Sequence, residues 1–270
     1  MGKGAATIYA DGETSKLYMQ DMVASQCTED GVTVYDKRDE KHYLVKKLAD
    51  GNCWLLDNLR LDPTAVDLAT LQGNTNASDQ TLDYFINGGR DAGDKYPTAG
   101  LANWTSGYSY SQPLTNAASK DTTVTSSGSG SGKVGVYYNY CAATTGSYCY
   151  GNDTSAGTSV GDAGEDICPA GWRMPTGGAN TVTTDGKGEY QALYTAYSSN
   201  VTNFKTALST PLSGYFDYGS AIFQGSRGSF WSSTKCGDTT MFYLRVDSSS
   251  VYPQTNNSRY SGYSVRCLLK

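Results

Sequence analysis

The chain has 270 residues, a length that fits one large domain or one domain with elaborate insertions. Its net charge of −5 argues against nucleic acid as a partner, because contact with phosphates requires a basic surface. No apolar run approaches the length of a membrane span. The first residues lack the apolar segment of an export signal, so the chain is either cytosolic or a secreted or cell-surface protein whose signal is not part of this sequence. We expect the second because of the cysteines.

Cysteine usage supports this compartment. None of the seven cysteines forms a C-x-x-C pair and His42 is the only histidine, so the usual zinc-ligand spacing is missing. A set of disulfides with one odd thiol fits the count and indicates an oxidising compartment. Seven reduced, buried thiols in a cytosolic protein are the alternative.

The N-terminal part of the chain predicts a β-meander. Residues 1–16 are expected to be a disordered leader, and residues 17–27 a short helix. Strands are expected at residues 32–35, 43–48 and 53–56, joined by polar turns. Cys27 and Cys53 flank this unit and can staple it.

Helices and long loops are expected to follow. Asp62 and Pro63 are typical of a helix start and predict a helix to Leu71, with a second helix from Ser78 to Ile86. Residues 91–166 show no hydrophobic periodicity and are interpreted as insertion loops with a flexible tip at residues 126–132.

Ordered structure is expected again from residue 167, after the insertion loops. Asp185 is expected to cap a helix through Tyr197, and residues 203–208 form a further helical segment. From Ser213 onward the sequence predicts strands and turns. The abundant tyrosines, 22 in all, suit either half-buried strand positions or a binding surface.

Six short sequence motifs, in this order along the chain, resemble those of a known family. They are YDKRD at 35–39, GNCWL at 51–55, YYNYC at 137–141, CPAGWRMP at 168–175, FWSST at 230–234 and GYSVRC at 262–267. Together they resemble the bacterial and archaeal major paralogous (FISUMP) domain, a branch of the C-type-lectin-fold proteins related to formylglycine-generating enzymes. The resemblance covers roughly residues 17–270 and implies a single α+β domain with a C-type-lectin-like fold, short antiparallel strands and a few short helices.

The C-terminal segment also resembles the variable proteins of diversity-generating retroelements. Such proteins are similar to a fixed lectin-type scaffold that carries a cassette of hypermutated codons. The resemblance implies a variable ligand-binding cassette at residues 231–267. The implied partner is a protein or a cell-surface ligand, and no cofactor is implied.

The residues themselves show a two-residue period in this segment. Phe242, Leu244 and Val246 alternate with Met241, Tyr243, Arg245 and Asp247, which predicts one core face and one chemically mixed outer face. Residues 254–258 are expected to form a polar loop. An ordinary half-exposed strand is the alternative. The candidate ligand-binding residues are Lys235, Cys236, Asp238, Thr239, Met241, Tyr243, Arg245, Asp247, Ser250, Tyr252, Thr255, Asn256, Asn257, Ser258, Tyr260 and Ser261.

Some residues depart from the pattern that adenine mutagenesis of asparagine codons produces. Such codons do not become Met, Lys or Gln, so whether Met241, Lys235 and Gln254 are fixed or variable stays open. Asn256 and Asn257 fit unchanged codons. Cys236 fits a chance product of mutation and explains the odd cysteine count.

The remaining expectations concern the scaffold. Pairing Cys168 with Cys267 and Cys141 with Cys149 is one arrangement among several that the sequence leaves open. Arg259 and Arg266 are both candidates for ligand contact, but Arg266 is interpreted as a scaffold residue that pairs with a carboxylate. The tryptophans at 54, 172 and 231 are expected in the core, as are residues 242, 244, 246, 251 and 265.

Catalysis is the rival reading, and we expect a protein that is not an enzyme. The related enzymes are oxidases that use paired cysteines with copper, a role open to Cys168 and Cys267 if they are not bridged. A serine hydrolase is disfavoured because His42 lies in the meander beside turn residues. Calcium-dependent sugar binding is a third alternative, for which the acidic run 162–166 is the weak candidate.

Overall fold

The computed structural model describes residues 16–87, 113–126, 130–146, 161–178, 187–237 and 239–270. The expected leader at residues 1–16 and the helix cap at Asp185 therefore fall almost entirely outside the described residues. In the first half of the chain the elements are η1 (Met19–Asp21), η2 (Ala24–Gln26), β1 (Val32–Tyr35), β2 (His42–Lys47), β3 (Cys53–Leu55), α1 (Leu68–Leu71), α2 (Asp79–Asn87), β4 (Thr115–Asn116), β5 (Thr123–Ser126) and β6 (Gly130–Lys133). The second half contains β7 (Tyr137–Tyr138), α4 (Tyr140–Ala143), β8 (Trp172–Arg173), α5 (Glu189–Ala196), α6 (Val201–Ala207), β9 (Tyr215–Asp217), β10 (Ser220–Ile222), β11 (Arg227–Lys235), β12 (Thr240–Asp247), β13 (Val251–Ser258) and β14 (Leu268–Leu269).

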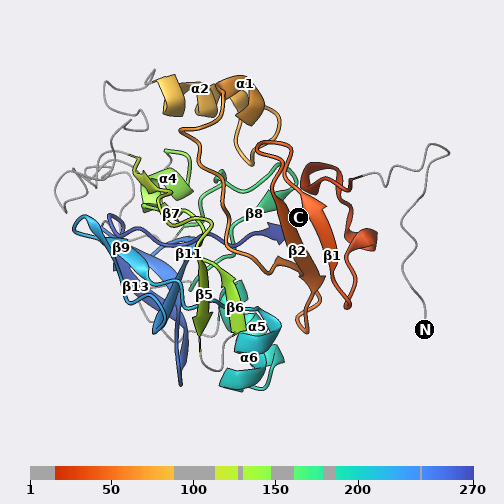
Figure 1. The fold of residues 1–270 in the computed structure, drawn as a ribbon, viewed down its shortest axis with the longest axis vertical. Coiled ribbons are helices and arrows are strands. Elements are labelled where there is room, and N and C mark those ends of the chain that lie inside the picture. Colours follow the sequence, from red (N-terminus) through yellow and green to blue (C-terminus); the bar gives the residue numbers. More distant parts are fainter. Residues whose placement is uncertain (1–15, 88–112, 127–129, 147–160, 179–186, 238) are drawn as a thin grey trace.

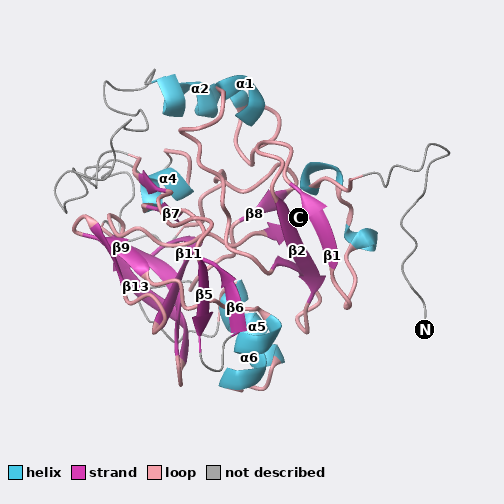
Figure 2. Ribbon diagram, in the orientation of Figure 1, coloured by secondary structure: helices cyan, strands magenta, loops and turns pink. Residues whose placement is uncertain are grey.

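The structure is α+β, with antiparallel sheets and short helices (Figure 2). A five-stranded sheet has the order β1-β2-β3-β14-β8, so the last strand of the chain lies between β3 and β8. A three-stranded sheet, β11-β12-β13, stands apart from it with the β9–β10 hairpin nearby (Figure 1). The helices α1 and α2 lie at one end of the molecule, and α5 and α6 lie at the other. Among the described residues, none of the helices has the length and apolar character that a membrane span needs.

The β-meander is confirmed. Strands β1, β2 and β3 lie within a residue of their expected bounds, and a disulfide joins Cys27 to Cys53 across them. The expected helix at 17–27 is wrong. The segment forms two 3₁₀ turns, and its backbone is held by longer-range bonds, since Tyr35 N donates to Leu17 O and Trp172 Nε1 donates to Met19 O.

The remaining helices differ from expectation mainly at their N-termini. Helix α1 begins at Leu68 rather than Pro63, because the Asp62 carboxylate accepts bonds from the Thr64 N–H and hydroxyl and holds a turn there. Helix α2 occupies the predicted segment. Helices α5 and α6 are confirmed, and the amide side chain of Asn200 accepts from Asn203 N to cap α6.

Part of the stretch expected to be insertion loops belongs to the core. Tyr137, Tyr138 and Tyr140 are almost completely buried, and the Trp231 indole donates to the Tyr138 carbonyl oxygen. Consecutive buried aromatic residues give no periodicity, which is why the sequence predicts a loop here. The expected flexible tip at 126–132 is instead partly a β5–β6 hairpin, and its residues 127–129 lie outside the described residues.

The described residues form three apolar clusters. One joins β1–β3 to Tyr138 of β7, α4 and β11, and another joins α5 and α6 to one face of β11 and β12. The third is small and contains residues 114, 134, 137 and 216. The tryptophans at 54, 172 and 231 are completely buried, as expected, and so are residues 242, 244, 246 and 265, with Val251 nearly so. Phe242 packs against Gly177 and Gly178, where a Cβ on Gly177 would lie 2.5 Å from that of Phe242.

Candidate binding surface

The two faces of the β11-β12-β13 sheet differ in what covers them. Residues directly opposite each other in a sheet lie on the same face. Arg227 lies opposite Asp247, and Arg245 lies opposite Tyr252. Tyr243 lies opposite both Trp231 and Thr255. We call the face that carries these residues the outer face. The opposite face carries Phe230, Leu244 and Val246 and packs under α5 and α6.

The outer face is divided into a covered half and an open half. Met241 is completely buried and Tyr243 is 5% exposed, because both belong to the apolar cluster that also contains Trp231 and Tyr263. The Tyr243 ring centroid lies 4.6 Å from that of Tyr263 and 6.2 Å from that of Trp231. The expectation that Met241 and Tyr243 face solvent is therefore wrong. They do share a face with Arg245 and Asp247, as the alternation predicts.

Other candidate residues are also buried. Lys235, Cys236 and Ser261 are between 1% and 6% exposed, and Arg259 is 3% exposed. The end of β11 is covered because residues 161–163 run along it, with Lys235 N donating to Gly161 O and Ala163 N donating to Ser233 O. Cys236 is a free thiol whose pKa is raised by burial.

The expected polar loop at 254–258 is a strand. Strand β13 continues to Ser258, paired with β12, and Gln254 is buried with its side-chain amide donating to Lys187 O. The candidate residues that are half-buried or exposed are Thr239, Arg245, Asp247, Ser250, Tyr252, Thr255, Asn256, Asn257, Ser258 and Tyr260. The candidate Asp238 lies outside the described residues.

The open half of the outer face is an array of charges and rings. Arg245 Nη2 lies 2.7 Å from Asp247 Oδ2, and Arg227 Nε lies 3.4 Å from Asp247 Oδ1, so one carboxylate serves two guanidinium groups. The Arg245 guanidinium lies 5.0 Å from the Tyr252 ring centroid, and the Tyr252 side chain is 45% exposed. Such an array offers aromatic area and hydrogen-bond donors to a ligand.

The β9–β10 hairpin adds residues that lie outside the predicted site. Phe223 lies under the Arg227 guanidinium at 4.5 Å, and its ring stacks on Tyr215 with centroids 5.8 Å apart. Tyr218 and Tyr260 approach through their hydroxyl groups at 3.3 Å. The signal in the sequence was the aromatic run Tyr215-Phe-Asp-Tyr218, followed by a glycine.

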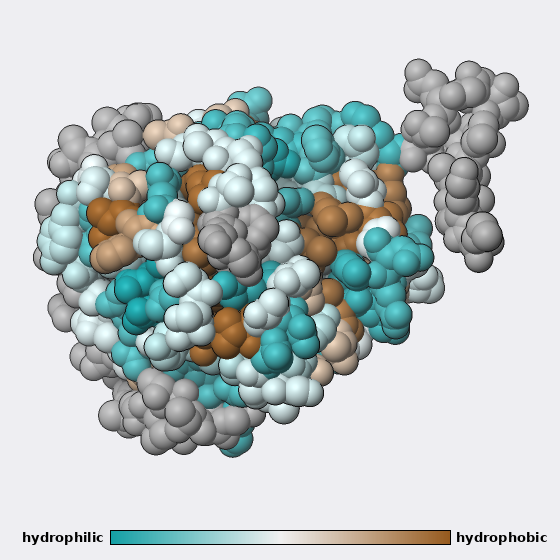
Figure 3. Space-filling model, turned by 60° about the horizontal axis from the view of Figure 1, so that its bottom comes forward, coloured by the Kyte–Doolittle hydropathy of each residue, from teal (hydrophilic) through white to brown (hydrophobic). Residues whose placement is uncertain are grey.

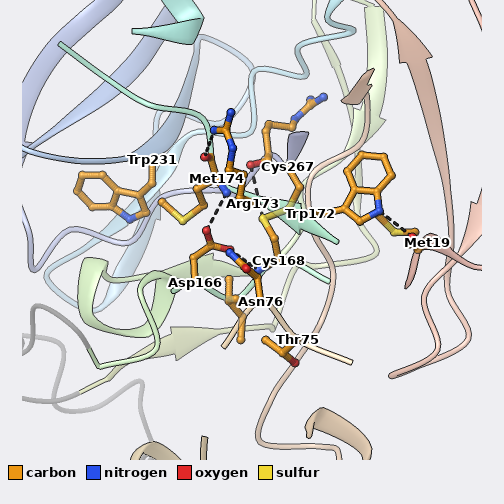
Figure 4. The surroundings of a disulfide bond; sticks show 12 residues. Met19, Thr75, Asn76, Asp166, Cys168, Trp172, Arg173, Met174, Trp231 and Cys267 are labelled. Carbon is orange, nitrogen blue, oxygen red and sulfur yellow. Dashed lines mark hydrogen bonds between the residues drawn. A yellow bond between two sulfur atoms is a disulfide. The ribbon is translucent and has the colours of Figure 1, made fainter. Parts of the chain in front are cut away.

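Cys168 and Cys267 are not the two free thiols that the oxidase alternative requires. Cys168 and Cys267 form a disulfide, and both are completely buried (Figure 4). The paired arrangement was one that the sequence left open, and it is confirmed. Of the other pair, Cys141 is disulfide-bonded, and Cys149 lies outside the described residues.

The acidic run near that disulfide is occupied with protein donors. Asp166 is buried and accepts hydrogen bonds from the N–H groups of Cys168 and Met174, both at 2.9 Å, and burial raises its pKa to about 6 (Figure 4). Asp162 accepts from the Thr234 hydroxyl, and Glu165 accepts from Ser78 N. Within the described ranges, no three His, Cys, Asp or Glu side chains are grouped to hold a metal ion.

Arg266 is a scaffold residue, but its partners differ from expectation. It is completely buried, and its guanidinium donates to the side-chain oxygen of Asn58 and to the carbonyl oxygens of Leu55, Leu208 and Ser209. In the part of the chain that is described, no carboxylate forms an ion pair with it. Burial lowers its pKa to about 10, so it stays charged at neutral pH.

Comparisons of the chain with protein-family models, with curated protein sequences and with solved structures gave no match. Two disulfides among the described residues fit a protein made for an oxidising compartment.

Proposed function

We propose that this chain is a secreted or surface-displayed binding protein whose C-terminal sheet presents a diversified ligand-binding face. The observation that carries this proposal is the separation of the two faces of β11-β12-β13. The face under α5 and α6 is built from Phe230, Leu244 and Val246, while Arg245 and Tyr252 stand at the surface on the other face. Changes at the exposed positions leave the core contacts intact, which is what a variable surface requires.

The phrases shared with the FISUMP domain support a C-type-lectin-like fold, and the α+β architecture with its antiparallel sheets is compatible with it. The resemblance to variable proteins of diversity-generating retroelements supports diversification of residues 231–267. Burial of Met241, Lys235 and Gln254, none of them more than 4% exposed, supports a fixed role for these residues. They are also the residues that adenine mutagenesis of asparagine codons does not produce.

The test is to sequence this locus in many individuals of the source population. We expect the codons of Arg245, Asp247, Tyr252 and Thr255 to vary at positions that are adenines in a nearby template copy. The codons of the buried residues 242, 244 and 266 are the internal control and should stay constant. A cassette as constant as residues 168–175 would contradict the retroelement origin of the surface.

A further inference from the structure

We propose that the β9–β10 hairpin is the fixed half of the binding surface, and that a protein partner bearing apolar side chains beside carboxylates docks across both halves. This inference rests on the proposed function and extends it to residues outside the predicted cassette. Tyr218 and Phe223 are 68% and 50% exposed, and with Tyr252 they account for three of the five exposed large hydrophobic side chains among the described residues. The other two, Val23 and Leu44, belong to the β1–β2 side of the molecule.

The backbone at Tyr218 and Phe223 is held in a conformation that bulky residues disfavour. Strands β9 and β10 are joined by the two-residue loop Tyr218-Gly219, in which φ is +45° and +80°. Positive φ at both positions defines the turn in which asparagine followed by glycine is preferred. Phe223 also has a positive φ, +59°. Left-handed conformations of bulky residues are outliers that concentrate at functional sites.

Contacts within the free protein explain these two aromatic residues only in part: Phe223 contacts Tyr215 and Arg227, yet both rings stay at least half exposed. A ring that stays exposed contributes little hydrophobic stabilisation to the fold. At a left-handed backbone position an aromatic residue also has a higher conformational energy than asparagine or glycine. Both positions nevertheless carry aromatic side chains. Contact with a partner supplies the apolar burial that the free protein does not provide.

The hairpin rings are held in place before any partner arrives. The Tyr218 hydroxyl meets that of Tyr260, a cassette residue, and Phe223 is fixed between Tyr215 and the Arg227 guanidinium. Rigid aromatic residues lose little conformational entropy on binding and dominate the energetics of protein interfaces together with arginine. The contact between Tyr218 and Tyr260 also joins the hairpin to the cassette as one surface.

Charge indicates what the partner offers. Arg227 and Arg245 share the carboxylate of Asp247, and Asp217 on β9 is the other acidic residue among the described residues of the hairpin and of β11, β12 and β13. Beyond its Nε contact with Asp247, the Arg227 side chain makes no hydrogen bond to the described residues, so its terminal N–H groups are available. Carboxylates on a partner match these donors.

On the surface shown in Figure 3, apolar residues form separate patches divided by polar residues, so this view shows no broad continuous apolar surface. Three cavities of 220 to 330 Å³ among the described residues lie away from the hairpin, and Ser233 is the one cassette residue in their linings. Exposed tyrosine and phenylalanine side chains at a hairpin, beside an arginine of the neighbouring strand, suit a protein surface better than a buried small molecule.

The test uses the whole protein as bait for a phage-displayed library of random linear and disulfide-cyclised peptides. We expect enriched peptides that combine acidic and apolar residues. Tyr218→Asn is the main variant, because asparagine suits the left-handed backbone: it should raise the melting temperature and weaken peptide binding by about tenfold or more. Leu44→Ala, an exposed apolar residue on β2, is the matched control and should leave binding unchanged.

The outcomes separate this inference from the proposed function. Binding that is lost in Tyr252→Ala but retained in Tyr218→Asn would remove the hairpin from the surface and leave the cassette as the binding site. Binding that survives both changes would refute both proposals. A fall in melting temperature for Tyr218→Asn would show a structural role for the tyrosine. Failure to enrich any peptide, or binding to an immobilised glycan array that Tyr218→Asn abolishes, would overturn the protein partner.

Discussion

Tyr243 and Tyr252 provide a direct test of the divided outer face. They are the same residue type on the same face of one sheet, yet Tyr243 is 5% exposed and Tyr252 is 45% exposed. Replacing a buried aromatic residue by alanine typically costs about 3–5 kcal/mol of unfolding free energy, because transfer energy is lost and a cavity remains. The rings of Trp231 and Tyr263, themselves fully enclosed, leave little room for the site to collapse.

We therefore expect Tyr243→Ala to lose about 3–5 kcal/mol and Tyr252→Ala to stay within about 0.5 kcal/mol of the parent protein. Tyr243→Phe is the intermediate control, since it keeps the ring and loses about 1 kcal/mol of hydrogen bonding. Urea unfolding followed by tryptophan fluorescence measures all three, with Trp231 as a nearby reporter. Equal losses for the two alanine variants, or a negligible loss for Tyr243→Ala, would refute the division of the face.

Three further predictions concern the scaffold. The pKa of Asp166 is raised to about 6 in the folded state, so its stabilising contribution is full below its unfolded pKa near 4 and is lost as pH rises through 6. Asp166→Asn should flatten that pH dependence of the unfolding free energy, worth up to about 3 kcal/mol, and an unchanged pH profile would contradict the assignment. Arg266→Met should cost at least about 3 kcal/mol in urea unfolding, because three buried oxygens, Asn58 Oδ1 and the carbonyls of Leu55 and Leu208, lose their donor at about 1–3 kcal/mol each. A near-neutral result would show that these oxygens find other partners. Removing the Cys168–Cys267 disulfide by a double alanine substitution should cost about 4–5 kcal/mol, since the bond closes a loop of 99 residues, and a melting temperature equal to that of the parent would argue against it.

Local pattern was sufficient for several parts of the fold. The polar turns at residues 36–40 and 50–51 delimited β1 to β3, and the two-residue period sorted residues 241–247 correctly onto two faces. It also identified the core residues 242, 244 and 246, because a strand packed on one side under helices must bury every second residue. The bridge from Cys27 to Cys53 followed from their positions at the two ends of the meander.

Local pattern misled where burial depends on distant segments. The run Tyr137-Tyr-Asn-Tyr140 has no period, yet its aromatic side chains are buried by residues far along the chain: Tyr137 packs on Phe216, and Tyr138 and Tyr140 lie in one cluster with Trp231. Residues 254–258 are polar, so their sequence predicts a loop. They form a strand because they pair with β12, a tertiary contact that the polarity of the side chains does not indicate.

The sequence by itself determined the antiparallel strands, the core tryptophans and which residues of β12 share a face, since these follow from the two-residue period and from the cost of exposing large apolar groups. Only the tertiary structure decided which half of the outer face is open. Tyr263 and Trp231 pack against Tyr243, and Met241 is buried in the same cluster, whereas Arg245 and Tyr252 remain accessible. The period of a strand fixes the side on which a side chain points, and the packing of segments distant in sequence fixes whether that side meets water.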